Sequence, residues 1–299
     1  MASVLRNGMA SRRIFLGGGA ALAGAASTLG ALPGRALAQE EPVGRLKQVL
    51  DRGHVIVGTG SSTPPWHFED DQGQLVGMDI EVSRLLANAL FGDPEKVEFV
   101  SQAADVRIPN LLADKVDITI QFMSVTAERA QLVDFTVPYY REAITVLLLK
   151  ESPYNTLAEM QGKGITVSAL QNPHIETVAH EGIPDAKVEQ FDSVANTALA
   201  LDAGRVDAML ADYSTAQWLT AQNPEKYKYP PETWASHNYA AAVAPGDARW
   251  LNFVNEVFVD MMTGFQFAGF HDAFLQYFGI DLVKPPAGAP LLLSERSAG

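Results

Sequence analysis

Two groups of polar residues have the types and positions needed to hold a small zwitterion. Ser124 and Arg129 follow the run 116–121, which has the composition of a strand. A carboxylate in the loop between them could accept hydrogen bonds from the hydroxyl and from the planar fork of the guanidinium. Asp212 directly follows a second apolar run, 206–211, and could hold an ammonium group. Ligands of open α/β sheets bind beyond the carboxyl ends of the strands, so both groups are expected at such ends.

Motifs for covalent, metal or phosphate chemistry are absent from the sequence. It contains no GxSxG, no HExxH and no glycine-rich phosphate loop after a strand. The six histidines show no metal-ligand spacing, and the absence of cysteine excludes disulfides, thiolate catalysis and cysteine-based zinc sites. The net charge of −13 argues against nucleic acid as a partner, because phosphates require clustered basic residues. We therefore expect a protein that is not an enzyme and has no cofactor and no metal.

The elements that must position these residues form a regular series. Apolar runs typical of strands alternate with amphipathic helical patterns, which predicts an α/β fold with parallel strands. The expected strands are 54–58, 97–100, 116–121, 142–150, 164–169, 187–191, 206–211 and 239–244. The expected helices are 79–90, 108–113, 126–132 (capped by Thr126), 173–180, 193–203, 213–221, 247–262 and 265–278.

Several motifs, in order, resemble the extracellular solute-binding proteins of polar amino-acid ABC importers (family 3, with the type II periplasmic binding fold). They include Arg107-Ile-Pro-Asn-Leu-Leu, Lys115-Val-Asp-Ile-Thr-Ile, Thr126-Ala-Glu-Arg and Val133-Asp-Phe-Thr-Val-Pro-Tyr-Tyr. Val57-Gly-Thr with Pro64-Pro-Trp, Leu75-Val-Gly-Met-Asp-Ile-Glu-Val, Gly204-Arg-Val-Asp-Ala with Asp212, and Phe253-Val-Asn-Glu continue the match. The resemblance covers roughly residues 45–279, nearly the whole chain after its leader.

The resemblance implies a two-lobed periplasmic clamp with two hinge crossings and the ligand between the lobes. Lobe 1 is expected to contain residues 43–141 and 240–283, lobe 2 residues 142–239, and the tail 284–299 is expected to be irregular. The function it implies is capture of an amino acid or a similar small carboxylate for an ABC importer. The implied partner is a permease in the inner membrane, and the binding protein is expected to be a monomer.

Carried over by position, the resemblance also assigns binding roles. Arg129 would bind the α-carboxylate, with Ser124, Gln121 and the backbone at Phe122 around it, and Asp212 would hold the α-ammonium. Two further residues complete the implied site. Trp66 would stack on the ligand, and Arg107 stands where members that bind dicarboxylates place an arginine for the second carboxylate, although many other members have arginine there.

Each assignment competes with a structural role. Arg129 could form an ion pair on a helix surface, and Asp212 could cap the helix that follows it, which is compatible with ligand binding. Trp66 could belong to the core and Arg107 could be structural, while Gln121 and Phe122 could serve sheet packing only.

One loop departs from the family pattern. Lobe 2 of the family usually carries a Gly-Thr/Ser-Thr loop after a strand, but here the sequence is Leu170-Gln-Asn-Pro173. Asn172 is expected to cap the next helix and to donate to the ligand, and Pro173 suits the first helical position. Because the glycine is missing, the usual carboxylate geometry can change, and a modified amino acid or another small carboxylate remains possible.

The first 38 residues are typical of a leader for export. Arg12 and Arg13 precede a stretch without charge, 14–33, which ends near the small-x-small site at 36–38. This order predicts a cleaved twin-arginine signal peptide, although a membrane anchor is the alternative. Removing its four arginines leaves 18 basic and 35 acidic residues, a net charge of −17. We therefore expect a protein that is soluble in the periplasm.

Two other functions remain open. A periplasmic cyclohexadienyl dehydratase would resemble the same clamp but would place a general acid in the cleft, for which Glu176 beside His174 is the nearest candidate. A sensor module is the third possibility, although no kinase or membrane-spanning segment follows the predicted clamp.

Overall fold

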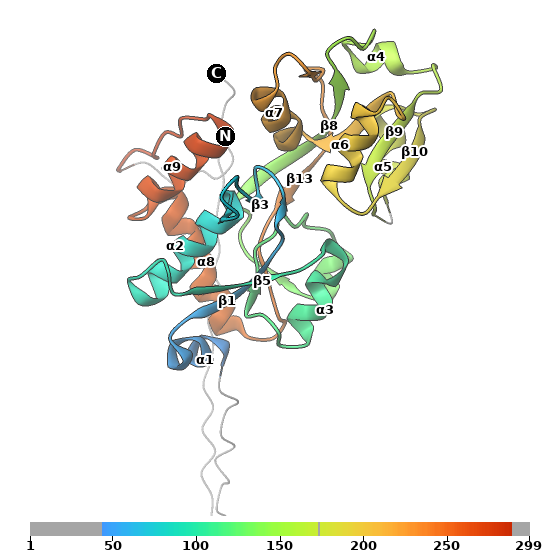
Figure 1. The fold of residues 1–299 in the computed structure, drawn as a ribbon. Helices are drawn as coiled ribbons and strands as arrows, with labels where there is room; N and C mark the ends of the chain where they lie inside the picture. The colour runs from blue at the N-terminus through green and yellow to red at the C-terminus, as the bar shows by residue number, and fades with distance from the viewer. Residues whose placement is uncertain (1–43, 173, 289–299) are drawn as a thin grey trace, which may run out of the picture. The chain divides into compact units, whose positions relative to one another are not determined.

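The computed structural model describes residues 44–172 and 174–288 (Figure 1). The expected leader, 1–38, lies outside this part of the chain, as do Pro173 and the end of the tail, 289–299. For the described residues, the structure gives two separate mixed sheets and a small three-stranded sheet, so the α/β class expected from the sequence is confirmed.

The first sheet has the strand order β5-β1-β6-β14-β7. Strand β1 is parallel to its neighbours β5 and β6, whereas β14 runs antiparallel to both of its neighbours. The strands are β1 (Val55–Thr59), β5 (Val97–Ser101), β6 (Ile118–Thr119), β7 (Asp134–Phe135) and β14 (Ala242–Val243). The accompanying helices are α1 (Arg45–Arg52), α2 (Met78–Phe91), α3 (Arg107–Leu112), α8 (Ala248–Thr263) and α9 (Phe267–Phe278).

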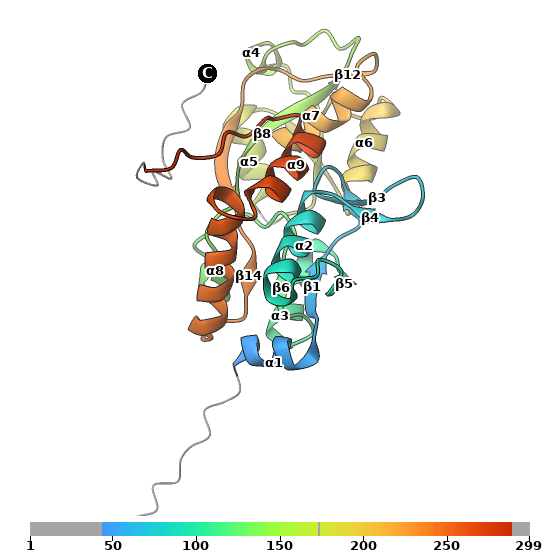
Figure 2. The ribbon, with the colours of Figure 1, turned by 90° about the vertical axis from the view of Figure 1, so that its left-hand side faces the viewer.

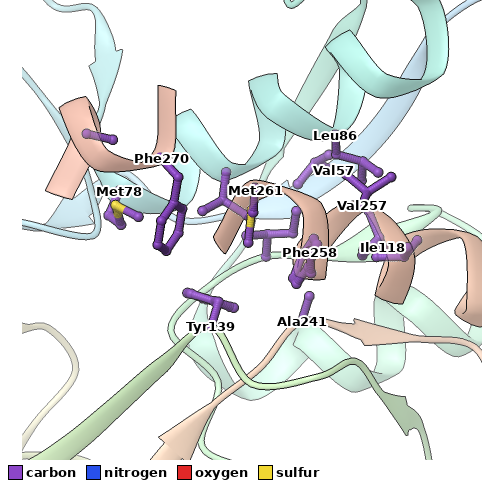
Figure 3. Packing of buried hydrophobic residues seen from close by; sticks show 14 of the residues in the cluster. Val57, Met78, Leu86, Ile118, Tyr139, Ala241, Val257, Phe258, Met261 and Phe270 are labelled. Carbon is purple, nitrogen blue, oxygen red and sulfur yellow. The ribbon is translucent and has the colours of Figure 1, made fainter. Parts of the chain in front are cut away.

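The core beside this sheet forms where helices α2, α8 and α9 pack together (Figure 3). In α2, the residues at positions i, i+4 and i+8 are apolar and buried, namely Met78, Val82 and Leu86. Phe258 of α8 and Phe270 of α9 are almost completely buried in the same cluster. Burying a side chain of this size contributes about 1.5–3 kcal/mol, so this cluster provides a rigid base for the loops at the strand ends.

The second sheet has the order β10-β9-β11-β8-β12, and β13 also pairs with β8. Its strands are β8 (Tyr140–Leu149), β9 (Thr166–Leu170), β10 (Lys187–Phe191), β11 (Ala208–Asp212), β12 (Tyr227–Lys228) and β13 (Trp234–Tyr239). The helices of this region are α4 (Leu157–Met160), α5 (Ile175–Gly182), α6 (Val194–Asp202) and α7 (Tyr213–Gln222). Helix α7 lies beside α9 (Figure 2). The rings of Trp218 and Tyr277, one from each helix, are 6.3 Å apart.

The remaining elements are short. The three-stranded sheet consists of β2 (Ser62–Thr63), β3 (His67–Glu69) and β4 (Leu75–Val76), and the 3-10 turns are η1 (Ala104–Val106) and η2 (Arg129–Gln131).

The chain passes between the two larger sheets twice, at 136–139 and at 240–241. These passages flank an antiparallel strand pair in which Tyr140 lies opposite Tyr239. Residues 142–239 therefore do not extend the sheet that contains 55–59. The limits of the two lobes, which the sequence placed near these passages, stay a prediction.

Several elements differ from the sequence-based expectation. The strand expected over 239–244 is interrupted at 240–241, because the chain changes sheets there. The helix expected over 126–132 is only the 3-10 turn η2, although the Thr126 hydroxyl does accept a hydrogen bond from the backbone of Arg129 (3.2 Å). The helix expected from Pro173 begins instead at Ile175.

Candidate ligand-binding pocket

A cavity of about 400 Å³ lies between residues of the two larger sheets. Side chains from α3 and from the loop after β6 line one wall, and side chains from β11, α5 and α6 line the other. Six of the eight residues expected to bind ligand line this cavity: Arg107, Phe122, Ser124, Arg129, Asn172 and Asp212.

Arg107 packs against the ring of Phe122 on the first wall. The Arg107 guanidinium donates from Nε to the carbonyl of Ala104 (2.8 Å) and from Nη1 to that of Gln121 (2.9 Å). Its central carbon lies 5.5 Å from the centre of the Phe122 ring, a cation–π distance. Burial, together with repulsion from Arg129, lowers the pKa of Arg107 to about 10. Arg107 thus supports the pocket loop and also carries positive charge at the pocket.

Phe122 has an unusual backbone conformation. Its φ of +33° lies in the left-handed region, which costs a residue with a side chain about 1–3 kcal/mol. The buried Asp79 carboxylate holds this conformation, because it accepts a hydrogen bond from the Phe122 N–H (2.9 Å). Asp79 also accepts hydrogen bonds from the Tyr139 hydroxyl (2.8 Å) and is paired with the His67 ring (2.9 Å). The conformation is therefore enforced by a buried polar network.

Arg129 lies beside Arg107 and is only partly buried. Its Nη1 donates to the carbonyl of Ser124 (2.8 Å), so the guanidinium points back across its own loop. Desolvation lowers the pKa of Arg129, and no carboxylate lies within ion-pair distance of Arg107 or Arg129 in the described part of the chain. The first wall therefore presents two cations whose charge is not neutralised locally.

Asp212 supplies negative charge on the opposite wall. It ends β11 and occupies the N-cap position of α7, but its side chain makes no capping hydrogen bond. Its Oδ2 instead accepts a hydrogen bond from the Tyr239 hydroxyl (2.5 Å). Desolvation raises the pKa of Asp212, while the Tyr239 hydrogen bond, His237 and Arg107 act in the opposite direction.

A second carboxylate lies behind this wall. Glu142 of β8 is 1% exposed, and its Oε2 accepts from the Ser214 hydroxyl (2.5 Å). Burial, and then the charge of Asp212, raises the pKa of Glu142 to about 8. Ser214 also accepts a hydrogen bond from the indole of Trp66 (3.0 Å). A buried polar chain therefore runs from Trp66 through Ser214 to Glu142.

Two predicted site residues do not line the pocket. Trp66 is fully buried among Tyr140, Tyr239 and Phe278. Trp66 therefore does not reach the cavity in this arrangement, which favours its alternative role in the core. Gln121 is 3% exposed, and its amide exchanges hydrogen bonds with Gln102, so only its backbone carbonyl supports the site, through Arg107.

The loop that departs from the family pattern lines the second wall. Gln171, Asn172 and His174 all border the cavity. The expectation that Asn172 caps helix α5 is wrong, because His174 is the N-cap residue. The Asn172 side chain accepts instead from the His174 N–H (3.0 Å), a local turn that competes with helical capping. Across the cavity, the His174 ring lies 2.9 Å from the carboxylate of Glu128.

The sequence reasoning missed the three pocket residues on β13, Ala235, His237 and Tyr239. A bulge between Trp234 and His237, with Ala235 at φ +50°, sets the direction of the His237 side chain. The His237 Nδ1 lies 2.8 Å from the Ala235 carbonyl. The sequence analysis began a strand at 239 and expected no element before it, so these residues were not recognised. The polar His-Asn-Tyr segment just before a small apolar run was an available signal.

Among residues 44–172 and 174–288, no helix is long and apolar enough to cross a membrane. Within the same ranges, no group of three or more histidine or acidic side chains is placed to hold a metal ion.

Comparison with known proteins identifies the family of this chain. A family model for the bacterial extracellular solute-binding proteins, family 3, matches residues 55–277. The chain belongs to this family. A glutamine-binding protein of Geobacillus stearothermophilus is 28% identical over 200 residues, which cover 67% of this chain and 76% of the relative.

Solved structures extend the comparison. The ancestral amino acid-binding protein AncCDT-1, described as a precursor of cyclohexadienyl dehydratase, has a TM-score of 0.69 and 28% identity, covering 78% of this chain and 99% of that chain. An ancestral arginine-binding protein bound to arginine has a TM-score of 0.65 and 32% identity, covering 76% and 99%. The two-lobed clamp expected from the sequence is therefore confirmed as the fold class.

Proposed function

We propose that this solute-binding protein captures an α-amino acid, or a closely similar small carboxylate, for an ABC importer. The observation that carries the proposal is the placement of opposite charges on the two walls of one cavity. Arg129 lies on the first wall and Asp212 on the second. An α-amino acid carries a carboxylate and an ammonium on one carbon, so it could neutralise both walls at once.

The names of the relatives support an amino acid as the ligand class. They are called glutamine-, L-cystine- and histidine-binding proteins, and the ancestral structure holds arginine. The differences between these ligands lie in their side chains. The shared recognition would therefore fall to Arg129, Ser124 and Asp212, while the side chain of the ligand would contact residues such as Phe122 and Met209.

Closure is the second part of the proposal. We assign residues 43–141 and 240–283 to lobe 1 and residues 142–239 to lobe 2. The ligand would dock on Arg129 of lobe 1 first and then recruit Asp212 of lobe 2. Only a ligand that contacts both lobes can stabilise the closed form. A permease in the inner membrane would then recognise this form, with the protein acting as a monomer in the periplasm after cleavage at residue 38.

The dehydratase alternative is not favoured by the position of its candidate acid. Glu176 lies in the first turn of α5 with an exposed side chain, and it is not among the residues that line the cavity. A general acid must come within hydrogen-bond reach of the substrate. The arrangement therefore favours binding without turnover.

A thermal-shift screen with the standard amino acids tests the ligand class. A ligand present at a hundred times its Kd should stabilise the protein by about 2.7 kcal/mol, which raises the melting temperature by several degrees. Calorimetry would then give the Kd, and an assay with arogenate would detect turnover. The des-amino and decarboxylated analogues of the best ligand are matched controls, and both should bind more weakly. If no amino acid stabilises the protein, or if arogenate is consumed, the proposed function is wrong.

A further inference from the structure

Tyr239 connects the two walls of the pocket through one side chain. It is the last residue of β13 and is 1% exposed. Its backbone carbonyl accepts from the N–H of Tyr139 (3.1 Å), and its backbone forms an isolated bridge with Ser124. Its hydroxyl reaches the opposite wall, where it donates to Oδ2 of Asp212 (2.5 Å). Tyr239 therefore links the loop that contains Ser124 to the carboxylate of Asp212.

The direction of this hydrogen bond determines what Asp212 can still do. An ionised carboxylate only accepts hydrogen bonds, so the phenol must be the donor. Tyr239 occupies Oδ2, and no further hydrogen bond to the Asp212 side chain occurs among residues 44–172 and 174–288. Because Asp212 lines the cavity, its Oδ1 remains free to accept from a ligand.

The Tyr239 ring is fixed on several sides. Its centre lies 5.1 Å from that of Trp66, 5.9 Å from that of Phe122 and 6.0 Å from that of Tyr140. A ring held by three aromatic neighbours loses little additional freedom when its hydroxyl forms a bond. The hydroxyl is therefore preorganised to receive the carboxylate, in the sense used for donors in binding sites.

We propose that Tyr239 is a positioning residue, whose hydroxyl orients the Asp212 carboxylate and stabilises its charge so that the carboxylate selects ligands that carry an ammonium group. This inference rests on the proposed function, because it assumes that Asp212 meets the ammonium of an amino acid. Tyr239 itself acts through Asp212.

The electrostatic surroundings show why such support is needed. Burial raises the pKa of Asp212, and the hydrogen bond from Tyr239 is the first influence that lowers it. Removing the hydroxyl should raise the pKa of Asp212 further and leave more of it protonated and uncharged. The other titratable or charged groups around the carboxylate are Glu142 and Tyr140 on β8, His237 on β13 and Arg107 on α3.

The binding experiment compares Tyr239→Phe with Tyr227→Phe. The buried Tyr227 hydroxyl also donates to a carboxylate, that of Asp202 (2.7 Å), but Tyr227 does not line the cavity, so it controls for the loss of a buried phenol. Calorimetry would measure the Kd of the best amino acid and of its des-amino analogue. Tyr239→Phe should weaken binding of the amino acid by roughly tenfold or more but change binding of the analogue by less than about threefold. Tyr227→Phe should preserve the wild-type ratio of the two affinities.

The pH profile separates positioning from a general structural role. Affinity for the amino acid should fall as the pH falls, because Asp212 gains a proton. In Tyr239→Phe the same fall should occur at higher pH. An unchanged profile, or equal weakening of both ligands by Tyr239→Phe, would overturn the proposal.

A measurement without ligand distinguishes this inference from the proposed function. Nuclear magnetic resonance of isotope-labelled aspartate carboxyl carbons, with the Asp212 signal identified by its loss in Asp212→Asn, gives the pKa directly. Tyr239→Phe should raise this pKa, because the carboxylate loses a hydrogen bond to its charged form, and an unchanged value would contradict the proposal. If the pKa rises but wild-type protein binds no amino acid, Tyr239 still controls Asp212 and the proposed function alone is wrong.

Discussion

The two walls of the pocket hold their charged groups by different means. On the first wall, carbonyl oxygens of nearby loops anchor both arginines, at Ala104, Gln121 and Ser124. On the second wall, a phenol from another strand holds Asp212, 27 residues away in sequence. The difference indicates that local chain geometry sets the direction of the cations, whereas the direction and charge of the carboxylate depend on tertiary structure.

The largest expected effect follows from removing Arg129, the less buried of the two cations on the first wall. Arg129→Ala should weaken binding of the amino acid by about 3–5 kcal/mol, at least a hundredfold in Kd, because it leaves a carboxylate without its partner. Calorimetry measures the change. Arg249→Ala, an exposed arginine on α8, is the matched control and should bind normally. Wild-type affinity in Arg129→Ala would show that the first wall is not the carboxylate site.

A smaller effect is expected on the second wall. Asp212→Asn keeps the shape and can still accept from Tyr239, so it should cost about 2 kcal/mol, roughly thirtyfold in Kd. It should also remove the loss of affinity at low pH, since Asp212 no longer titrates. Small-angle scattering should show contraction of the wild-type protein with ligand and less contraction of the variant. Normal closure in Asp212→Asn would remove Asp212 from the mechanism.

The carboxylate behind the second wall should affect stability and its dependence on pH. The folded-state pKa of Glu142 is raised to about 8 from 4.5. The folded protein therefore holds a proton that the unfolded chain releases, and stability should fall as the pH rises from about 4.5 to about 8. Glu142→Gln should flatten this fall and stabilise the protein by about 2 kcal/mol at about pH 9.

Urea denaturation across this pH range measures the Glu142 effect. Glu95→Gln, which changes a highly exposed carboxylate in a surface ion pair with Arg84, is the control and should leave the pH dependence nearly unchanged. A wild-type stability that rises between about pH 5 and 8 would contradict the position assigned to Glu142.

The smallest effect concerns the contact between the walls at the His174–Glu128 pair. Both side chains are more than half exposed, so the pair should contribute little in water. His174→Ala should weaken ligand binding by at most about fivefold, and added salt should reduce the difference. A much larger loss would show that the ligand contacts His174 itself.

The sequence predicted most of the longer elements in their correct order and six of the residues that line the cavity, for physical reasons. Apolar periodicity reports which face of an element is buried, so strands such as 187–191 were placed at their observed bounds. Arg129 and Ser124 belong to one short loop, which a motif can capture. The positions of Tyr239 and Glu142 depend on the pairing of strands β8, β11 and β13, which periodicity does not reveal.

Trp66 marks the limit of inference from residue type. An aromatic residue near a strand end suits stacking on a ligand and suits a core equally well. Only the tertiary structure favours the core role, because four aromatic rings pack around Trp66 and its indole donates a hydrogen bond to Ser214. Asn172 is similar, because its side chain could satisfy either a helix end or a tight turn, and the turn prevailed.

The link between Trp66 and Ser214 gives the molecule an optical signal of its own. The indole is fully buried beside the first sheet, while its nitrogen donates to a hydroxyl on the helix that follows β11. Indole emission moves to longer wavelengths when water reaches the ring. Separation of the two sheets would break this bond and expose the indole to water. The emission wavelength of Trp66 would therefore report opening and closing without an attached dye.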